Sequence, residues 1–215
     1  MQAYFGRVIP KSKIYEHGSV NTAMREKFIA QIDKIIWSYK LAPETINLAA
    51  SESVPEIQVF DVFLKANELG EDVLRVLDKA IPFPIIYQIH RNDQVKVKAA
   101  YKRPSESDKR KWVIESYFES EWLDSEDPKI KLPVALNLIK LYEQMIQFLM
   151  PIDIRDQPNQ GSLKDQVDKI QLIKAKEREY EKLKAKRDKE QQFNRKAELN
   201  SQLKLIKKEL DELRQ

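Results

Sequence analysis

The sequence predicts an α/β or α+β domain with flanking helices around a central mixed sheet of four to five strands, followed by a long C-terminal helical arm. Two observations support this fold class. Over the first 150 residues the apolar patterns run in the order helix, strand, strand, helix, hairpin, strand, helix, which is typical of a sheet packed against helices. After Gly161 the chain has no Gly or Pro and is rich in Lys, Glu, Gln and Leu, which favours helix.

The first predicted elements are a short strand or ordered tail over residues 3–10 and a helix that begins near Asn21. Asn is a favourable N-cap residue, and the apolar side chains after it return at helical spacing. These side chains are Met24, Phe28, Ile32, Ile35, Ile36 and Tyr39. We expect the helix to end at residues 41–43, and the alternating residues 45–50 to form a strand.

Residues 56–65 give the strongest strand prediction, because Val, Ile and Phe make most of this stretch apolar on both faces. A helix over residues 71–81 follows, with acidic residues in its first turn and Lys79 in its last, as the helix dipole favours. Residues 84–90 form the next strand. This strand–helix–strand unit is compatible with a right-handed crossover between parallel strands.

A turn over residues 91–94 connects this strand to the alternating residues 94–102, which predicts a β-hairpin. A further strand spans residues 111–122. Pro133 stands at a natural first position of a helix whose apolar stripe continues to Met150.

The predicted organisation is a mixed domain over residues 1–150, a linker over 151–161 and a basic helical coiled-coil arm over 162–215. The arm has two apolar seams with heptad-like spacing. The first consists of Leu163, Val167, Ile170, Ile173, Tyr180 and Leu183. The second, the predicted partner-binding surface, consists of Leu199, Leu203, Ile206, Leu210 and Leu213. Because the pattern between the seams is polar, the arm is either a hairpin, in which the seams bury each other, or one long helix, which needs another chain.

The basic surplus of the chain lies in the arm. From residue 162 onward, 16 Lys and Arg stand against 11 Asp and Glu, a net charge of +5, whereas the whole chain has +4. The candidate nucleic-acid-binding residues are Lys182, Lys184, Lys186 and Arg187 in the arm and Lys96 and Lys98 on the hairpin strand. Lys102 belongs to the same predicted strand face. The alternative interpretations are a solvated helix face with internal ion pairs and an edge strand protected by lysines.

Composition excludes several kinds of site. The chain has no Cys, which excludes disulfides and thiolate ligands, and its two His residues are too few for a His-rich metal site. Four Gly residues, none in the required pattern, provide neither a phosphate-binding loop nor a dinucleotide fingerprint. There is no signal-peptide run and no apolar stretch of about 18 residues. We therefore expect a cytoplasmic protein with no membrane span and no cofactor.

One enzymatic alternative is a metal-dependent nuclease, which needs carboxylates and a Lys that converge on Mg²⁺. The candidates are Glu26, Glu56, Asp61 and Lys65. Asp61 interrupts an apolar strand, where an unpaired carboxylate is costly, and Lys65 follows on the same strand face. A salt bridge from Asp61 to Lys65 or Lys79, or an edge position, would explain Asp61 without catalysis. The spacing also lacks the Asp/Glu-x-Lys element of restriction-type nucleases.

Several segments with core-type residues resemble an uncharacterised bacterial domain family, a domain of unknown function. They are IPKSKI (9–14), PEIQVFD (55–61), VLRVLDKAIPFP (73–84), IIYQI (85–89) and AAYK (99–102). The resemblance implies a shared fold over about residues 5–150, leaves the arm open and brings no catalytic residues. It also implies a genetic context, because such families are typically encoded beside helicases and DNA methyltransferases of restriction-like, phage-defence gene sets.

The first functional hypothesis is therefore a non-catalytic accessory subunit of such a complex. It would dock a helicase or methyltransferase through the mixed domain and the arm, or self-associate through the arm. The first alternative is a nucleic-acid-binding subunit that contacts DNA with the basic arm. The second is the metal-dependent nuclease, although enzymatic activity is not the expected outcome.

Overall fold

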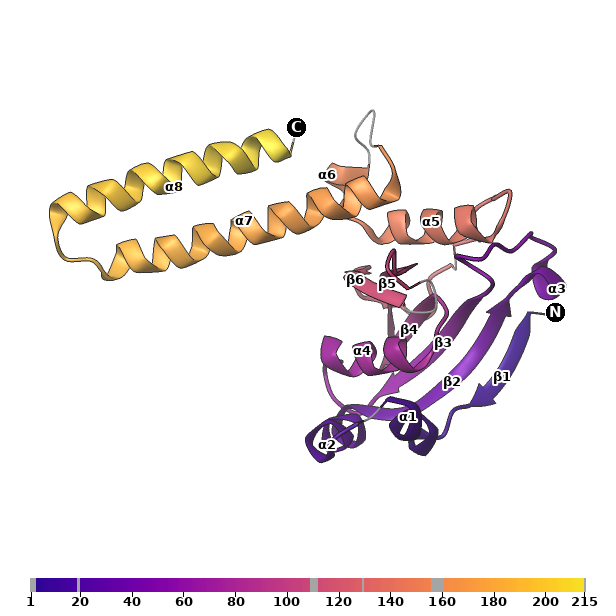
Figure 1. The fold of residues 1–215 in the computed structure, drawn as a ribbon. Coiled ribbons are helices and arrows are strands. Elements are labelled where there is room, and N and C mark those ends of the chain that lie inside the picture. Colours follow the sequence, from indigo (N-terminus) through magenta and orange to yellow (C-terminus); the bar gives the residue numbers. More distant parts are fainter. Residues whose placement is uncertain (1–2, 19, 109–111, 129, 156–160, 215) are drawn as a thin grey trace. The chain divides into compact units, whose positions relative to one another are not determined.

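The computed structural model describes residues 3–18, 20–108, 112–128, 130–155 and 161–214. The chain divides into two units, Met1–Met150 and Pro151–Gln215. The first contains a sheet and the second is helical (Figure 1). Among the described helices, none is long and apolar enough to span a membrane.

The first unit is built on a mixed sheet in the spatial order β1-β2-β3-β4-β5-β6, with β7 paired to β5. The strands are β1 (Tyr4–Val8), β2 (Ile32–Leu41), β3 (Ile57–Leu64), β4 (Ile85–Arg91), β5 (Gln94–Pro104), β6 (Trp112–Glu119) and β7 (Leu123–Asp124). Strands β3 and β4 are parallel, and the other neighbours are antiparallel. The mixed α/β class is confirmed, but the sheet has seven strands instead of four to five.

The helices of this unit are α1 (Lys11–Gly18), α2 (Thr22–Gln31), α3 (Pro43–Ile46), α4 (Glu71–Ala80) and α5 (Leu138–Leu149). Helices α1, α2 and α4 lie over one face of the sheet (Figure 1). There Phe28, Leu74 and Leu77 pack with Phe60 and Tyr87 of the strands, all fully buried. The crossover helix α4 connects the parallel strands β3 and β4, as the strand–helix–strand pattern predicted.

The predicted helix from Asn21 to residues 41–43 is wrong in its second half. Asn21 caps α2 through a hydrogen bond from the Met24 N–H, but α2 ends at Gln31 and β2 begins at Ile32. Two register irregularities interrupt the pairing of β2 with β3. Every third residue of β2 is buried, from Ile32 to Leu41, and this spacing is close to that of a helix.

Two further boundaries differ from the sequence prediction. Residues 45–50 do not form a strand, because α3 starts at Pro43 and the Thr45 side chain accepts a hydrogen bond from the Ala42 N–H, which fixes a helical turn. The helix predicted from Pro133 begins instead at Leu138, after the N-cap Asn137. The side-chain oxygen of Asn137 accepts a hydrogen bond from the backbone N–H of Lys140 inside the helix. Pro133 has no side-chain acceptor with which to cap a helix in this way.

The second unit contains α6 (Ile152–Arg155), α7 (Leu163–Lys189) and α8 (Phe193–Leu213). Ser162 and Asp165 form a capping box at the start of α7, as the sequence indicated. Helices α7 and α8 form an antiparallel hairpin (Figure 1). Residues 156–160 of the predicted linker lie outside the described residues. A coiled-coil geometry for this hairpin stays a prediction.

Candidate functional site

Asp61, the candidate carboxylate within β3, lies in a polar cluster with Ser38 of β2 and His90 of β4. Its carboxylate accepts a hydrogen bond from the Ser38 hydroxyl and lies 2.6 Å from His90 Nε2. The His90 ring stacks on Phe63, with ring centroids 4.5 Å apart. These partners offset the cost of a carboxylate in an apolar strand. Ser38 donates its hydroxyl hydrogen to Asp61 rather than to His90, so the three residues do not have the order of a nucleophilic triad.

The other candidate nuclease residues lie on α2 and beside the two ends of β3. Glu26 is exposed on α2. Glu56 precedes β3 and pairs with Lys40 at 3.3 Å, whereas Lys65 follows β3 and is exposed. At about 3.3 Å per residue, Glu56 and Lys65 are roughly 16 and 13 Å from Asp61 along the chain. Across the described ranges, no three His, Cys, Asp or Glu side chains are grouped to hold a metal ion.

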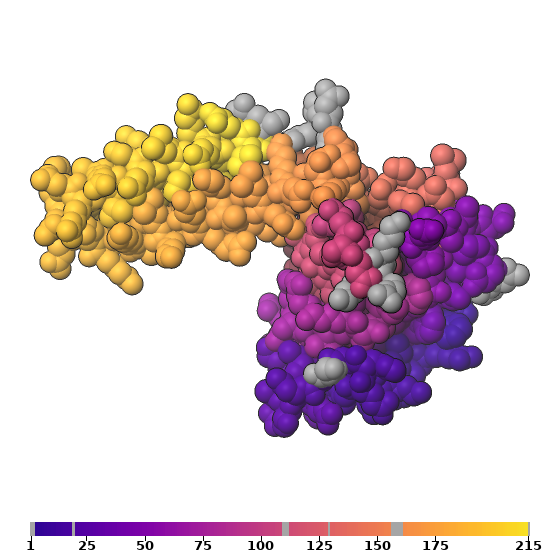
Figure 2. Space-filling view, viewed as in Figure 1, coloured from indigo at the N-terminus to yellow at the C-terminus, as the bar shows by residue number. Residues whose placement is uncertain are grey.

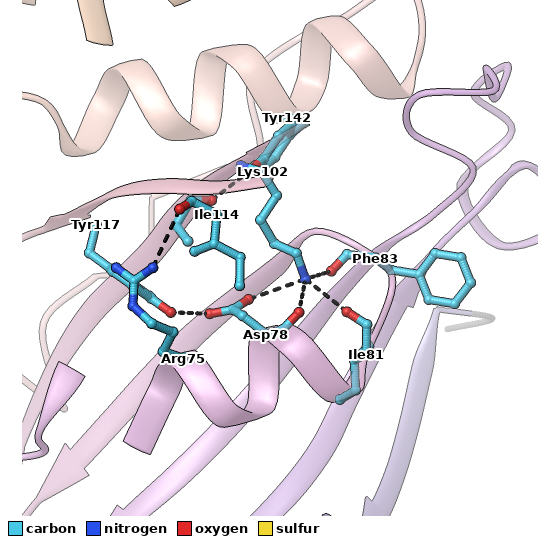
Figure 3. A network of polar contacts seen from close by, with 9 residues as sticks. Arg75, Asp78, Ile81, Phe83, Lys102, Ile114, Tyr117 and Tyr142 are labelled. Atoms are coloured by element: carbon cyan, nitrogen blue, oxygen red, sulfur yellow. Dashed lines mark hydrogen bonds and ion pairs between the residues drawn. The ribbon is translucent and has the colours of Figure 1, made fainter. Parts of the chain in front are cut away.

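A second polar cluster is buried beside α4 (Figure 3). The side chains of Lys102 on β5 and Asp78 on α4 are fully buried, with Lys102 Nζ 3.4 Å from Asp78 Oδ1. The same ammonium donates to the backbone oxygens of Asp78, Ile81 and Phe83, each at 2.8 Å. Because the last carbonyl groups of a helix have no partner within the helix, Lys102 satisfies the C-terminal end of α4.

Two tyrosines complete this buried cluster. The Tyr117 hydroxyl donates to Asp78 Oδ2 at 2.5 Å. The Tyr142 hydroxyl accepts a hydrogen bond from the backbone N–H of Lys102 and donates one to the Ala100 carbonyl, both at 2.7 Å. Burial lowers the pKa of Lys102 and raises the pKa of Asp78, against the opposing effect of each partner's charge. The cluster joins α4, β5, β6 and α5, and its burial indicates a structural role.

Lys96 and Lys98, the sheet residues predicted to contact nucleic acid, both pair with Glu119. The distances are 2.9 and 2.7 Å, and the two lysine side chains are only 18% and 13% exposed. Lys102, the third lysine of the predicted basic face, is buried instead, and a register shift separates it from Ala100. This strand therefore presents less free positive charge than its sequence indicates.

The hairpin buries most of the apolar seam that was predicted to bind a partner. The residues of α8 that are at most 7% exposed within the single chain are Leu199, Leu203, Ile206 and Leu210. Leu213, at the end of the seam, is partly exposed. Lys176 on α7 pairs with Glu209 on α8 at 2.6 Å, and the two helices lie side by side along their length (Figure 2). In this conformation the seam holds the hairpin together, and other surfaces are left for a partner.

A groove follows one side of the hairpin, between α7 and α8, and we call it the outer groove. Its apolar lining consists of Leu183, Ala185, Leu205 and Ile206. Leu205 is 63% exposed, so the groove offers apolar surface to the solvent. Its basic lining consists of Lys176, Lys182, Lys186 and Lys189, and Glu179 and Glu209 supply its carboxylates. This combination of an apolar floor and charged edges is typical of a surface that binds an amphipathic segment.

The positive charge of the arm gathers around the turn of the hairpin. Residues 182–208 hold ten Lys and Arg against three Asp and Glu, a net charge of +7. Residues 162–181 are balanced at five against five, and residues 209–215 have a net charge of −2. Of the candidate nucleic-acid-binding residues here, Lys184 pairs with Glu181 and Arg187 with Asp188. Lys182 and Lys186 form no ion pair with any other described residue.

Together, the fold and these surfaces define a mixed α/β protein that carries a basic helical hairpin. The chain belongs to the family described as Domain of unknown function (DUF4391), whose model matches residues 1–210. The match confirms the predicted membership of an uncharacterised family, and it includes nearly the whole hairpin. Searches of the curated proteins and of the solved structures gave no match.

Sequence reasoning missed the outer groove, because it followed only the heptad seams. The available signal was Leu205, a leucine between two seam positions of α8, Leu203 and Ile206. It also missed the contact of Ser38 with Asp61, because Ser38 fell inside a predicted helix. No sequence signal distinguished Lys102 from Lys96 and Lys98 before the register of β5 was known.

Proposed function

We propose that this protein is a non-catalytic accessory subunit that docks a larger protein. The observation that carries this proposal is the outer groove of the hairpin. The inner seam is already buried within the chain, yet the outer side still exposes Leu205 between lysine side chains. When a partner removes an exposed apolar strip of the hairpin from water, this burial stabilises the complex.

The partner that we propose is a helicase or DNA methyltransferase of a restriction-like or phage-defence complex. This part of the proposal comes from the gene context expected of the family. The family model includes the hairpin as well as the sheet unit, which supports a role for the hairpin that members share. The sheet unit would supply a second docking surface, or position the hairpin on the partner.

The test is purification of the tagged full-length chain from its own cells at native expression level, followed by identification of the proteins that elute with it. We expect a helicase or methyltransferase in a fixed stoichiometric ratio. A chain that elutes alone, at its monomer mass, would contradict the proposal. Reconstitution of the partner's activity with and without the chain then measures what the subunit contributes.

A second candidate is a nucleic-acid-binding subunit, and the net charge of +7 over residues 182–208 favours it. If these side chains contact phosphates, the affinity for DNA falls steeply with salt, because binding releases counterions. The double variant Lys182→Glu, Lys186→Glu should then weaken binding and flatten the salt dependence. Lys13→Glu, at an exposed position on α1, is the matched control. Salt-independent or absent binding excludes this candidate.

A further inference from the structure

The outer groove of the hairpin has the geometry of a site for one additional helix. On α7 its lining begins at Lys176 and ends at Lys189, and on α8 it begins at Gln202 and ends at Glu209. On each helix the lining includes positions three or four residues apart, together with some of their neighbours, so it forms a broad stripe along one side of the helix. At 1.5 Å per residue, the stripe on α7 is about 20 Å long. A partner helix of about four turns matches this length.

The floor of the groove is apolar. Leu183 of α7 and Leu205 and Ile206 of α8 line it, and Leu205 has more than half of its surface exposed. Side chains three or four residues apart on two neighbouring helices form the ridges and depressions into which a third helix packs. Burial of such leucine surface stabilises a complex by roughly 25 cal/mol per Å² of apolar area.

The charges of the groove select the chemistry of the occupant. At one end, Lys176 is neutralised within the chain by Glu209 at 2.6 Å and Glu179 at 3.5 Å. Toward the turn of the hairpin, Lys182, Lys186 and Lys189 line the groove and form no ion pair with other described residues. An occupant that brings carboxylates to this end gains electrostatic complementarity, whereas a basic occupant is repelled.

We infer that this groove binds an amphipathic helix of a protein partner, with leucine-type residues on one face and Asp or Glu beside them. The inference rests on the proposed function, and it specifies the docking element of the partner. The bound helix packs between α7 and α8 as the third helix of a bundle. Its carboxylates lie near Lys182, Lys186 and Lys189.

The two competing occupants differ in the features they use. Nucleic acid uses the lysines and gains nothing from Leu205, because phosphate contacts are electrostatic. A second copy of the chain, placed symmetrically, brings an identical groove whose four lysines outnumber its two glutamates, so it supplies no surplus of carboxylates to Lys182, Lys186 and Lys189. Only an acidic amphipathic helix uses the apolar floor and the lysines at the same time.

The experiment measures binding of a synthetic helical peptide of about 18 residues, long enough for the groove, to the full-length chain by fluorescence anisotropy. The peptide has Leu at heptad positions a and d and Glu at e and g. We expect Leu205→Asp to weaken binding at least tenfold, because it places a carboxylate on the floor and removes apolar contact. Leu172→Asp is the matched control, because Leu172 is also exposed on α7, at 46%, but does not line the groove.

A second arm tests the charges. Lys186→Glu should weaken binding of the acidic peptide and reduce its dependence on salt. A peptide with the same Leu positions, but with Lys in place of Glu, should bind at least tenfold more weakly than the acidic peptide. Circular dichroism at 222 nm verifies that each variant keeps its helices.

Three results would overturn the inference. They are equal binding of the Lys and Glu peptides, unchanged binding by Leu205→Asp, and a dimer of the full-length chain that Leu205→Asp dissociates. The purification from native cells separates this failure from failure of the proposed function. If the native partner elutes with Leu205→Asp as it does with the unmodified chain, the accessory role stands and the groove assignment falls. If no partner elutes with the unmodified chain, the accessory role itself falls.

Discussion

Both units of this protein have ion pairs at the surface, and the sheet unit also has a completely buried one. In the sheet unit, Lys102 and Asp78 are completely buried, and the ammonium satisfies three backbone carbonyl groups at the end of α4. In the hairpin, pairs such as Arg214–Glu177 lie at the surface, with both side chains more than 40% exposed. Buried charges fix the arrangement of elements, whereas surface charges add little stability and stay available to partners.

The apolar cores of the two units differ in size. The sheet unit packs aromatic and aliphatic residues from three helices and several strands into one cluster. The hairpin relies mainly on one narrow seam between two helices. We therefore expect the hairpin to unfold before the sheet unit, and the predictions below test this difference from the largest effect to the smallest.

The largest effect is expected from Lys102→Met. Removal of the ammonium takes the opposite charge away from the buried Asp78 carboxyl and leaves three backbone carbonyl groups without their donor, which should cost about 3–5 kcal/mol of unfolding free energy. Urea unfolding followed by Trp fluorescence measures this, because all three Trp residues lie in the sheet unit. Lys98→Met, which breaks a pair with the 42%-exposed Glu119, is the control and should cost within about 1 kcal/mol. Equal costs for the two variants would contradict a special role for Lys102.

The next effect is expected from Leu203→Ala in the hairpin seam. Loss of a buried leucine side chain typically costs about 2–5 kcal/mol, which is large for a seam between two helices. We expect a loss of helical signal at 222 nm at lower temperature, while Trp fluorescence of the sheet unit is unchanged. Leu172→Ala, at an exposed position of α7, should leave both signals in place. Simultaneous loss of both signals in Leu203→Ala would show that the units unfold together.

A moderate effect is expected from His90→Ala. The substitution removes a hydrogen-bond partner of Asp61 and the ring that stacks on Phe63. A partly buried carboxylate that loses one partner should cost about 1–3 kcal/mol. The double variant His90→Ala, Asp61→Ala provides the control, because it removes the carboxylate as well. If its cost equals the sum of the two single costs, the residues are not coupled.

The smallest effect is expected at the start of α7, where the Ser162 hydroxyl and N–H hold the pKa of Asp165 below its ordinary value of 3.8. A lowered pKa means that ionised Asp165 stabilises the folded hairpin. This contribution is complete above the ordinary pKa and is lost as the pH falls through the lowered one. Asp165→Asn should therefore make hairpin melting, followed at 222 nm, less sensitive to acid below about pH 4. An unchanged acid dependence would contradict this.

Local sequence patterns correctly predicted the elements in which composition, charge placement and terminating residues all indicate the same structure. The strand–helix–strand unit around α4 combines a mostly apolar strand, a helix with favourable charges at both ends and prolines that end it. The hairpin seams and the capping box at Ser162 are of the same kind. In β2 the local pattern misled, because the buried residues lie three apart, close to the spacing of a helix, although the segment pairs with β3 as a strand.

The candidate site was only partly accessible from sequence. The basic surplus of the arm and its two seams follow from residue types and spacing alone. The outer groove depends on the seams burying each other, because only then do Leu205 and Lys186 line a groove between two helices.

What the sequence by itself determined is therefore the identity of the strongest strands and helices and the charge of each region. These depend on side-chain chemistry and on neighbours within a few residues. The tertiary structure alone decided the partners of Asp61, the burial of Lys102 and the two faces of the hairpin. Each of these joins residues that are distant in sequence, such as Asp61 with His90 and Lys102 with Asp78. Such contacts depend on strand register and helix packing, which no local pattern specifies.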